Sequence, residues 1–116
     1  MKLASLIAAR NVLQGLSNSL PFGVALKIAR FLKQSEEPNR LFEERRDAII
    51  NDYAVEDSAT GERRVPDDKI PEATRAIMDL GNEEISDITI RFAATDLDGI
   101  ALTANEAYAL LDLIDE

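Results

Sequence analysis

The sequence predicts a single α+β domain over residues 1–116 that is mostly helical: one long kinked helix, three shorter helices and a small antiparallel β element. Three observations predict this class. Apolar residues recur at three- and four-residue steps in most of the chain, one short segment alternates apolar and polar residues, and glycine, proline and capping residues separate these patterns. A length of 116 residues is typical of one domain.

Two helices account for the first half of the chain. Leucines at helical spacing predict a short amphipathic helix over residues 2–16, and a long helix follows from Pro21 to about Tyr53. Pro38 lies inside the long helix, where a proline removes one backbone hydrogen bond and crowds the preceding turn. It either kinks one continuous helix or separates a helix that stops near Glu36 from one that starts at Pro38, and we favour the kinked helix. The apolar face of the long helix comprises Val24, Ile28, Phe31, Phe42 and Ile49.

Shorter elements follow the long helix. Residues 56–61 are a turn, and residues 62–65 can form an edge strand that Pro66 ends. A helix is predicted from Pro71 to Leu80, with the next residue, a glycine, as its stop. The apolar face of this helix comprises Ile70, Ala73, Ile77 and Leu80.

The end of the chain predicts strands and a last helix. Residues 86–92 alternate apolar and polar side chains, which predicts a half-buried strand, and residues 100–102 can form a second strand after the turn at 96–99. Thr103 and Glu106 have the spacing of a capping box, so a helix begins there and runs to about Asp115. Its apolar face comprises Ala107, Leu110, Leu111 and Ile114.

Charge is divided unevenly along the chain. The net charge is −9, from 22 acidic and 13 basic residues. Residues 1–60 carry eight bases and eight acids, whereas residues 61–116 carry five bases and fourteen acids. This balance argues against a protein that binds nucleic acid directly through a basic surface. The acid-poor opening has an apolar run too short for a membrane span, so we expect no membrane association.

No catalytic pattern is present in the sequence. The chain has no Cys and no His, which excludes thiolate or imidazole nucleophiles, bases and zinc ligands. The run Asp96–Gly99 suggests a calcium loop, but its sixth and twelfth positions are Ala101 and Ala107 instead of Gly and Glu. We therefore expect a protein that is not an enzyme and needs no cofactor or metal. An enzyme that holds a metal ion with scattered carboxylates is the weakest alternative.

Short motifs along most of the chain resemble a known group of viral proteins. The motifs are Leu20-Pro21, Ala25–Arg30, Phe42–Arg46, Ile49–Tyr53, Val65-Pro66, Ile88–Ile90, Asp96–Gly99, Leu102–Glu106 and Leu110–Ile114. Together they resemble a family of small proteins of tailed bacteriophages and prophages for which no activity is established. The resemblance implies a phage accessory protein, located in the cytoplasm of the infected bacterial host or in the virion.

We expect this protein to act by protein–protein interaction. A long helix offers more apolar surface than a short chain can cover, which favours self-association or a protein partner such as a phage structural protein or a host enzyme. The expected anchor residues are Leu41, Phe42 and Tyr53.

The acidic second half of the chain supports a different hypothesis. Carboxylates at phosphate-like spacing could mimic nucleic acid and block a host enzyme of nucleic-acid binding or defence. The candidate carboxylates are Asp79, Glu83, Glu84, Asp87, Asp96 and Asp98.

Overall fold

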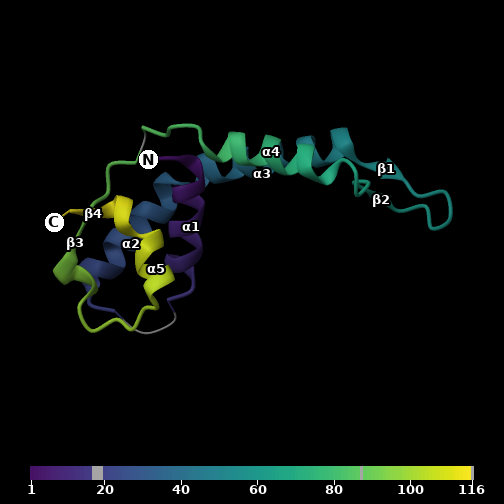
Figure 1. Cartoon of the computed structure of the whole chain (residues 1–116). Helices are drawn as coiled ribbons and strands as arrows, with labels where there is room; N and C mark the ends of the chain where they lie inside the picture. The colour runs from purple at the N-terminus through teal and green to yellow at the C-terminus, as the bar shows by residue number, and fades with distance from the viewer. Residues whose placement is uncertain (17–19, 87, 116) are drawn as a thin grey trace.

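The molecule consists of a head and an arm that projects from it (Figure 1). The structure, a computed structural model, describes residues 1–16, 20–86 and 88–115. We define the head as residues 1–35 and 82–115 and the arm as residues 36–81. The principal extents are 54 × 28 × 23 Å, so the molecule is about twice as long as it is wide.

Five α-helices, two 3₁₀ helices and two pairs of short strands make up the described chain. The head contains α1 (Leu3–Gln14), α2 (Phe22–Gln34), β3 (Phe92–Ala93), η1 (Ala94–Leu97), α5 (Ala104–Ala109), η2 (Leu111–Leu113) and β4 (Ile114–Asp115). The arm contains α3 (Glu36–Tyr53), β1 (Val55–Glu56), β2 (Arg63–Arg64) and α4 (Ile70–Gly81). The predicted class, a mostly helical α+β fold with a small antiparallel β element, is confirmed.

The core of the molecule lies in the head. Side chains at helical spacing on α1 and α2 face each other, and the C-terminal segment covers them. Phe31 of α2 and Phe92 of β3 are the largest fully buried side chains. The other buried core residues are Leu3, Leu6, Ala9, Leu13, Val24, Ile28, Leu80, Ile88, Leu110 and Leu113.

The predicted long helix is divided at Ser35 into two helices, which is closer to the alternative of one helix that stops near Glu36 than to one continuous kinked helix. α2 ends at Gln34 and α3 begins at Glu36, with Ser35 as the shared cap residue. Pro38 has no N–H to donate to the carbonyl of Gln34, and its ring crowds that carbonyl. The Asn39 N–H donates to the Ser35 carbonyl (3.0 Å), so α-helical bonding resumes directly after the proline. The arm leaves the head at this kink.

The arm is a pair of helices joined by a short hairpin at its tip (Figure 1). α3 runs outward, α4 returns beside it, and the buried Ala73 of α4 allows the two helices to approach closely. β1 and β2 pair antiparallel in the register Val55↔Arg64, which confirms the predicted edge strand before Pro66. Gly61 has a φ of +74°, a conformation that the tight turn of the hairpin requires and that glycine adopts readily.

The end of α4 packs closely against α1 in the head. Two residues after α4, the carbonyl of Glu83 accepts a hydrogen bond from the Leu3 N–H of α1 (2.9 Å). A Cβ at Gly81 would lie only 3.1 Å from the Cβ of Ala4, so the glycine lets the end of α4 approach α1 more closely than another residue could. Gly81 therefore has a packing role in addition to its predicted place at the end of the helix.

The C-terminal segment differs from the prediction in three places. The alternation around Ile88 and Phe92 correctly predicts the buried side chains, but only β3 is paired, and its partner is the parallel strand β4. Residues 100–102 are not a strand. The last helix has its predicted capping box but ends at Ala109, because the chain tightens into η2 and then extends to pair with β3. This path buries Leu113.

Candidate functional site

The described residues contain no group of side chains arranged for metal binding. Within residues 1–16, 20–86 and 88–115, no three Asp or Glu side chains lie close enough together to hold an ion. In the same part of the chain, no helix is long and apolar enough to cross a membrane.

The three predicted anchor residues lie on α3 but do not form one patch. Leu41 is 44% exposed. Phe42, one residue on, is half-buried against the core, and the guanidinium of Arg46 lies 5.8 Å from the centre of its ring. Tyr53 is half-buried at the end of the helix. Consecutive residues of a helix point in different directions, so Leu41 and Phe42 cannot contact the same part of a partner.

Two of the predicted carboxylates form close ion pairs within the molecule. Arg45 of α3 donates two hydrogen bonds to Glu83, at 2.6 and 2.8 Å. These bonds lower the pKa of the Glu83 carboxyl. Desolvation opposes them, and the positive charge of Arg45 adds to the lowering. Asp96 accepts hydrogen bonds from Lys27 (2.6 Å) and from the backbone N–H of Ala93 (2.8 Å), which also lower its pKa.

The other predicted carboxylates are less constrained. Glu84 lies 3.5 Å from the amino group of Met1. Asp79 and Asp98 are exposed and have no ion pair among the described residues. Asp87 lies outside the described residues. The structure thus leaves Asp79 and Asp98 as the candidates whose charge has no internal partner.

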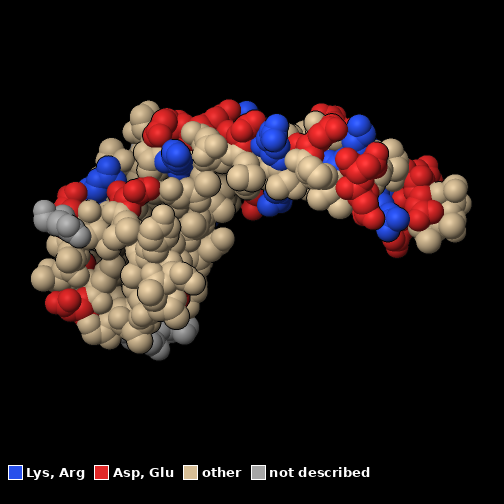
Figure 2. Space-filling model, in the orientation of Figure 1, with Lys and Arg blue, Asp and Glu red and all other residues tan. Residues whose placement is uncertain are grey.

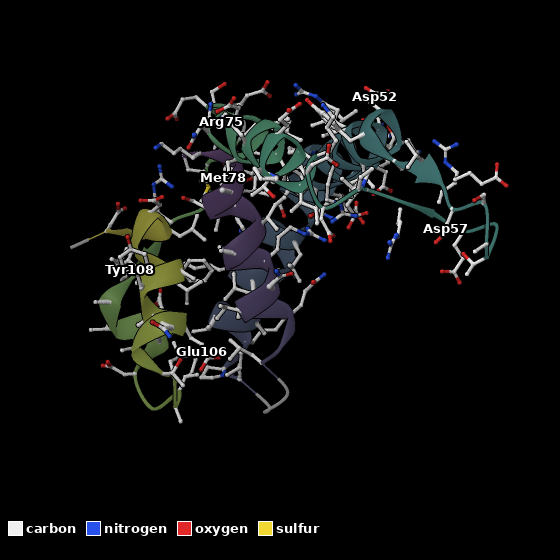
Figure 3. All side chains as sticks on the ribbon, turned by 45° about the vertical axis from the view of Figure 1, so that its right-hand side comes forward. Asp52, Asp57, Arg75, Met78, Glu106 and Tyr108 are labelled. Carbon is white, nitrogen blue, oxygen red and sulfur yellow. The ribbon has the colours of Figure 1, made fainter. Side chains whose placement is uncertain are left out.

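Lys, Arg, Asp and Glu side chains crowd the arm, whereas much of the visible face of the head is uncharged (Figure 2). α1 and α5 lie at the front of the head in the same view (Figure 1). A groove of about 530 Å³ runs between them, with Ala4 and Ala8 on one side and Tyr108 and Leu111 on the other. Tyr108 is 76% exposed and points from α5 toward α1 (Figure 3).

The sequence does not predict this groove, because its apolar spacing predicts a last helix that continues to about Asp115. Leu111 was expected on the apolar face of that helix, but α5 ends at Ala109 and Leu111 is 52% exposed. Ile70 was also expected to face inward, and it is exposed at the start of α4. Both positions have helical spacing, but no neighbouring element covers them.

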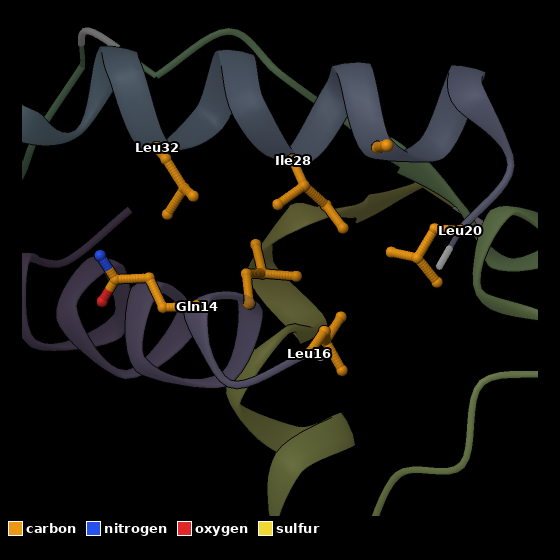
Figure 4. Close-up of a pocket in the computed structure, with 7 residues that line it drawn as sticks. Gln14, Leu16, Leu20, Ile28 and Leu32 are labelled. Atoms are coloured by element: carbon orange, nitrogen blue, oxygen red, sulfur yellow. The ribbon is translucent and has the colours of Figure 1, made fainter. Parts of the chain in front are cut away.

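A second apolar pocket, of about 380 Å³, lies between the end of α1 and α2 (Figure 4). Its lining includes Gln14 and the side chains of Leu13, Leu16, Leu20, Ile28 and Leu32. This pocket is adjacent in the chain to residues 17–19, which are outside the described part.

In comparisons with known proteins, no family model, no curated protein and no solved structure matches this chain. The surfaces described above are therefore the basis for a functional proposal.

Proposed function

We propose that this protein is a non-enzymatic module that acts by binding another protein through its arm. In the phage context that the sequence motifs imply, it would serve as an adaptor in virion assembly or as a binder of a host protein. The observation that carries the proposal is that α3, the longest helix, has no buried residue.

A helical arm with so little buried apolar surface is thermodynamically unfavourable unless a partner covers it. Ordering each residue costs roughly 1–2 kcal/mol in conformational entropy, which burial of apolar surface normally offsets. α3 obtains little of that compensation, and its apolar residues Leu41 and Ile50 remain 44% and 37% exposed. Val55, at the tip of the arm, is 53% exposed. A protein partner that covers these side chains would supply the missing burial.

The surroundings of Leu41 suit a contact point. Glu37 and Arg45 lie one helical turn before and after it, so the leucine stands among charged neighbours. An apolar anchor surrounded by polar side chains is the usual arrangement of a protein–protein interface. Leu41 is therefore a better anchor than Phe42, which already packs on the head.

The alternative, an acidic inhibitor that mimics nucleic acid, has weaker support. A mimic must present free carboxylates to a basic groove, and the carboxylates of Glu83 and Asp96 already have internal cations. Asp79 and Asp98 remain available. The proposal and this alternative differ in their response to salt, because attraction between exposed charges is screened and burial of apolar surface is not.

Photocrosslinking separates the two functions. A photoreactive residue is placed at Leu41, at Ile50 or, as the head control, at Asp98, and each variant is irradiated in nuclease-treated bacterial lysate at low and high salt. We expect a discrete protein adduct from Leu41 that persists at high salt, and a weaker one from Ile50, which lies on the opposite side of α3. Leu41→Asp should compete poorly with the unmodified protein for the Leu41 adduct, whereas Asp98→Asn should compete as well as it does.

Two results would contradict the arm proposal. Adducts that form only at Asp98 and vanish at high salt would favour the acidic mimic. Equal adducts at all three positions would mean that the arm has no specific role. An adduct with the mass of two copies of this chain would identify the partner as a second copy, which light scattering would check as a concentration-dependent dimer.

A further inference from the structure

A polar pocket lies between α1 and α3, next to the kink between head and arm. Its volume is about 270 Å³. Unlike the two apolar pockets, it is lined chiefly by polar side chains. These are Arg10, Asn11, Gln14, Asn39, Glu43 and Arg46.

Arg10 is the central group of this pocket. It is only 8% exposed, and its Nη1 donates to the Leu32 carbonyl (2.7 Å) and to the Ser35 hydroxyl (2.6 Å). These bonds attach α1 to the end of α2. Among the described residues no carboxylate lies within ion-pair distance of Arg10. Its positive charge is thus largely buried without a close ion pair among the described residues.

Two nitrogens of Arg10, Nε and Nη2, have no hydrogen-bond partner among the described residues. A guanidinium has five N–H donors, and both hydrogen bonds of Arg10 in the described chain use Nη1. No fully buried side-chain nitrogen or oxygen in the described residues lacks a partner, so Nε and Nη2 retain some exposure to solvent. Arg10 is also one of the residues that line the pocket.

The other lining groups add donors and one opposing charge. Arg46 contributes a second guanidinium, which also stacks near Phe42 and bonds to Asp47 at 3.2 Å. Asn11, Gln14 and Asn39 contribute uncharged amides. Glu43 is the acidic member of the lining, so the pocket carries two positive charges and one negative charge.

We propose that this pocket binds a small oxyanion, the phosphate or carboxylate group of a ligand. A guanidinium presents paired N–H donors that match two oxygens of either group, and such charge-assisted bonds are stronger than neutral ones. Buried charges in proteins are normally paired, and a bound oxyanion would pair Arg10. This site is separate from the exposed face of α3 and does not depend on the proposed function of the arm.

NMR of the arginine side chains tests the site directly. The protein is titrated with inorganic phosphate or with acetate at constant ionic strength maintained by chloride, and the Nε–H signals are followed. We expect saturable shifts at Arg10 and Arg46. Arg75, an exposed arginine without an ion pair among the described residues, is the control and should show only the small linear change of non-specific contact. The anion that saturates at lower concentration identifies whether the source is a phosphate or a carboxylate.

Three variants on α3 make the test independent of folding defects at Arg10. Arg46→Gln should weaken binding by roughly two- to fivefold, and Glu43→Gln should strengthen it by a similar factor, as expected for partly exposed charges. Arg40→Gln, which removes an exposed arginine paired with Glu37 and Glu44, should leave binding unchanged. Linear shifts with both anions, or equal effects of Arg46→Gln and Arg40→Gln, would overturn the proposal.

Discussion

The head and the arm are both built from helix pairs, yet they bury very different amounts of apolar surface. In the head, α1 and α2 share a continuous core with Phe92 and Leu113. In the arm, α3 has no buried residue, and α4 buries Ala73 near its start and Leu80 and Gly81 where it meets the head. The radius of gyration, 17.5 Å, exceeds the value of about 13 Å expected for a compact domain of about 100 residues. The molecule therefore joins a unit with a continuous core to a helix pair that buries few side chains.

Ion pairs replace packing along the arm. Arg40 bonds to Glu37 and Glu44 on the same helix, and Arg45 bonds to Glu83 at the return of the chain to the head. Exposed pairs of this kind contribute little each, because water and salt screen them. α3 is thus helical over 18 residues without a buried side chain, whereas its position beside α4 depends on contacts between the two helices.

Removal of a core side chain from the head should have the largest effect. Phe31 is fully buried, so Phe31→Ala should lower the free energy of unfolding by about 3–5 kcal/mol. The matched change in the arm, Leu41→Ala, should alter it by less than about 0.5 kcal/mol. Denaturant unfolding followed by circular dichroism measures both. Similar losses for the two variants would mean that the arm is packed as tightly as the head.

Hydrogen exchange should reveal the same difference without mutation. The outer half of α3 has no core to protect it, so its amides should exchange at least about tenfold faster than those in the middle of α1. Low concentrations of denaturant should accelerate exchange in α1, which requires global unfolding, more than in α3. Equal protection of the two helices would contradict this division into a stable and a weakly stable unit.

Acid should weaken the arm slightly through the pair of Glu83 and Arg45. Because Arg45 lowers the pKa of Glu83 in the folded chain, the pair stabilises the fold above the pKa of the unfolded chain. That contribution is lost as the pH falls through the folded pKa. A carbon-detected NMR titration should give a lower midpoint for Glu83 in the unmodified protein than in Arg45→Gln. An unchanged midpoint would mean that the ion pair does not persist in solution.

The periodic helices could be predicted from the sequence, and the contacts that depend on distant residues could not. The spacing of Leu3, Leu6 and Leu13 predicts one buried face wherever α1 packs. The end of α5 depends on the pairing of β4 with β3, which are far apart in the chain. No local signal indicates such a parallel pair.

The same limit applies to the candidate sites. The sequence indicates that Leu41 lies on a long helix, and the structure adds that no other element covers it. The partners of Glu83 and Asp96 are 38 and 69 residues away, so their pairing has no sequence signature. The role of Arg10 could not be predicted either, since a single arginine on an apolar helix belongs to no motif. Only the kink places its free donors beside Arg46 in one pocket.

The position of the arm in the middle of the chain has a consequence for synthesis on the ribosome. α1 and α2 emerge first, but Phe92 and Leu113, which complete their core, are among the last residues made. At about 5–20 residues per second, roughly 4–16 s pass between the emergence of Leu32 and Leu113. During that interval the apolar faces of α1 and α2 stay accessible to chaperones. The contacts that complete the head core are thus separated by most of the chain, and such non-local contacts slow folding.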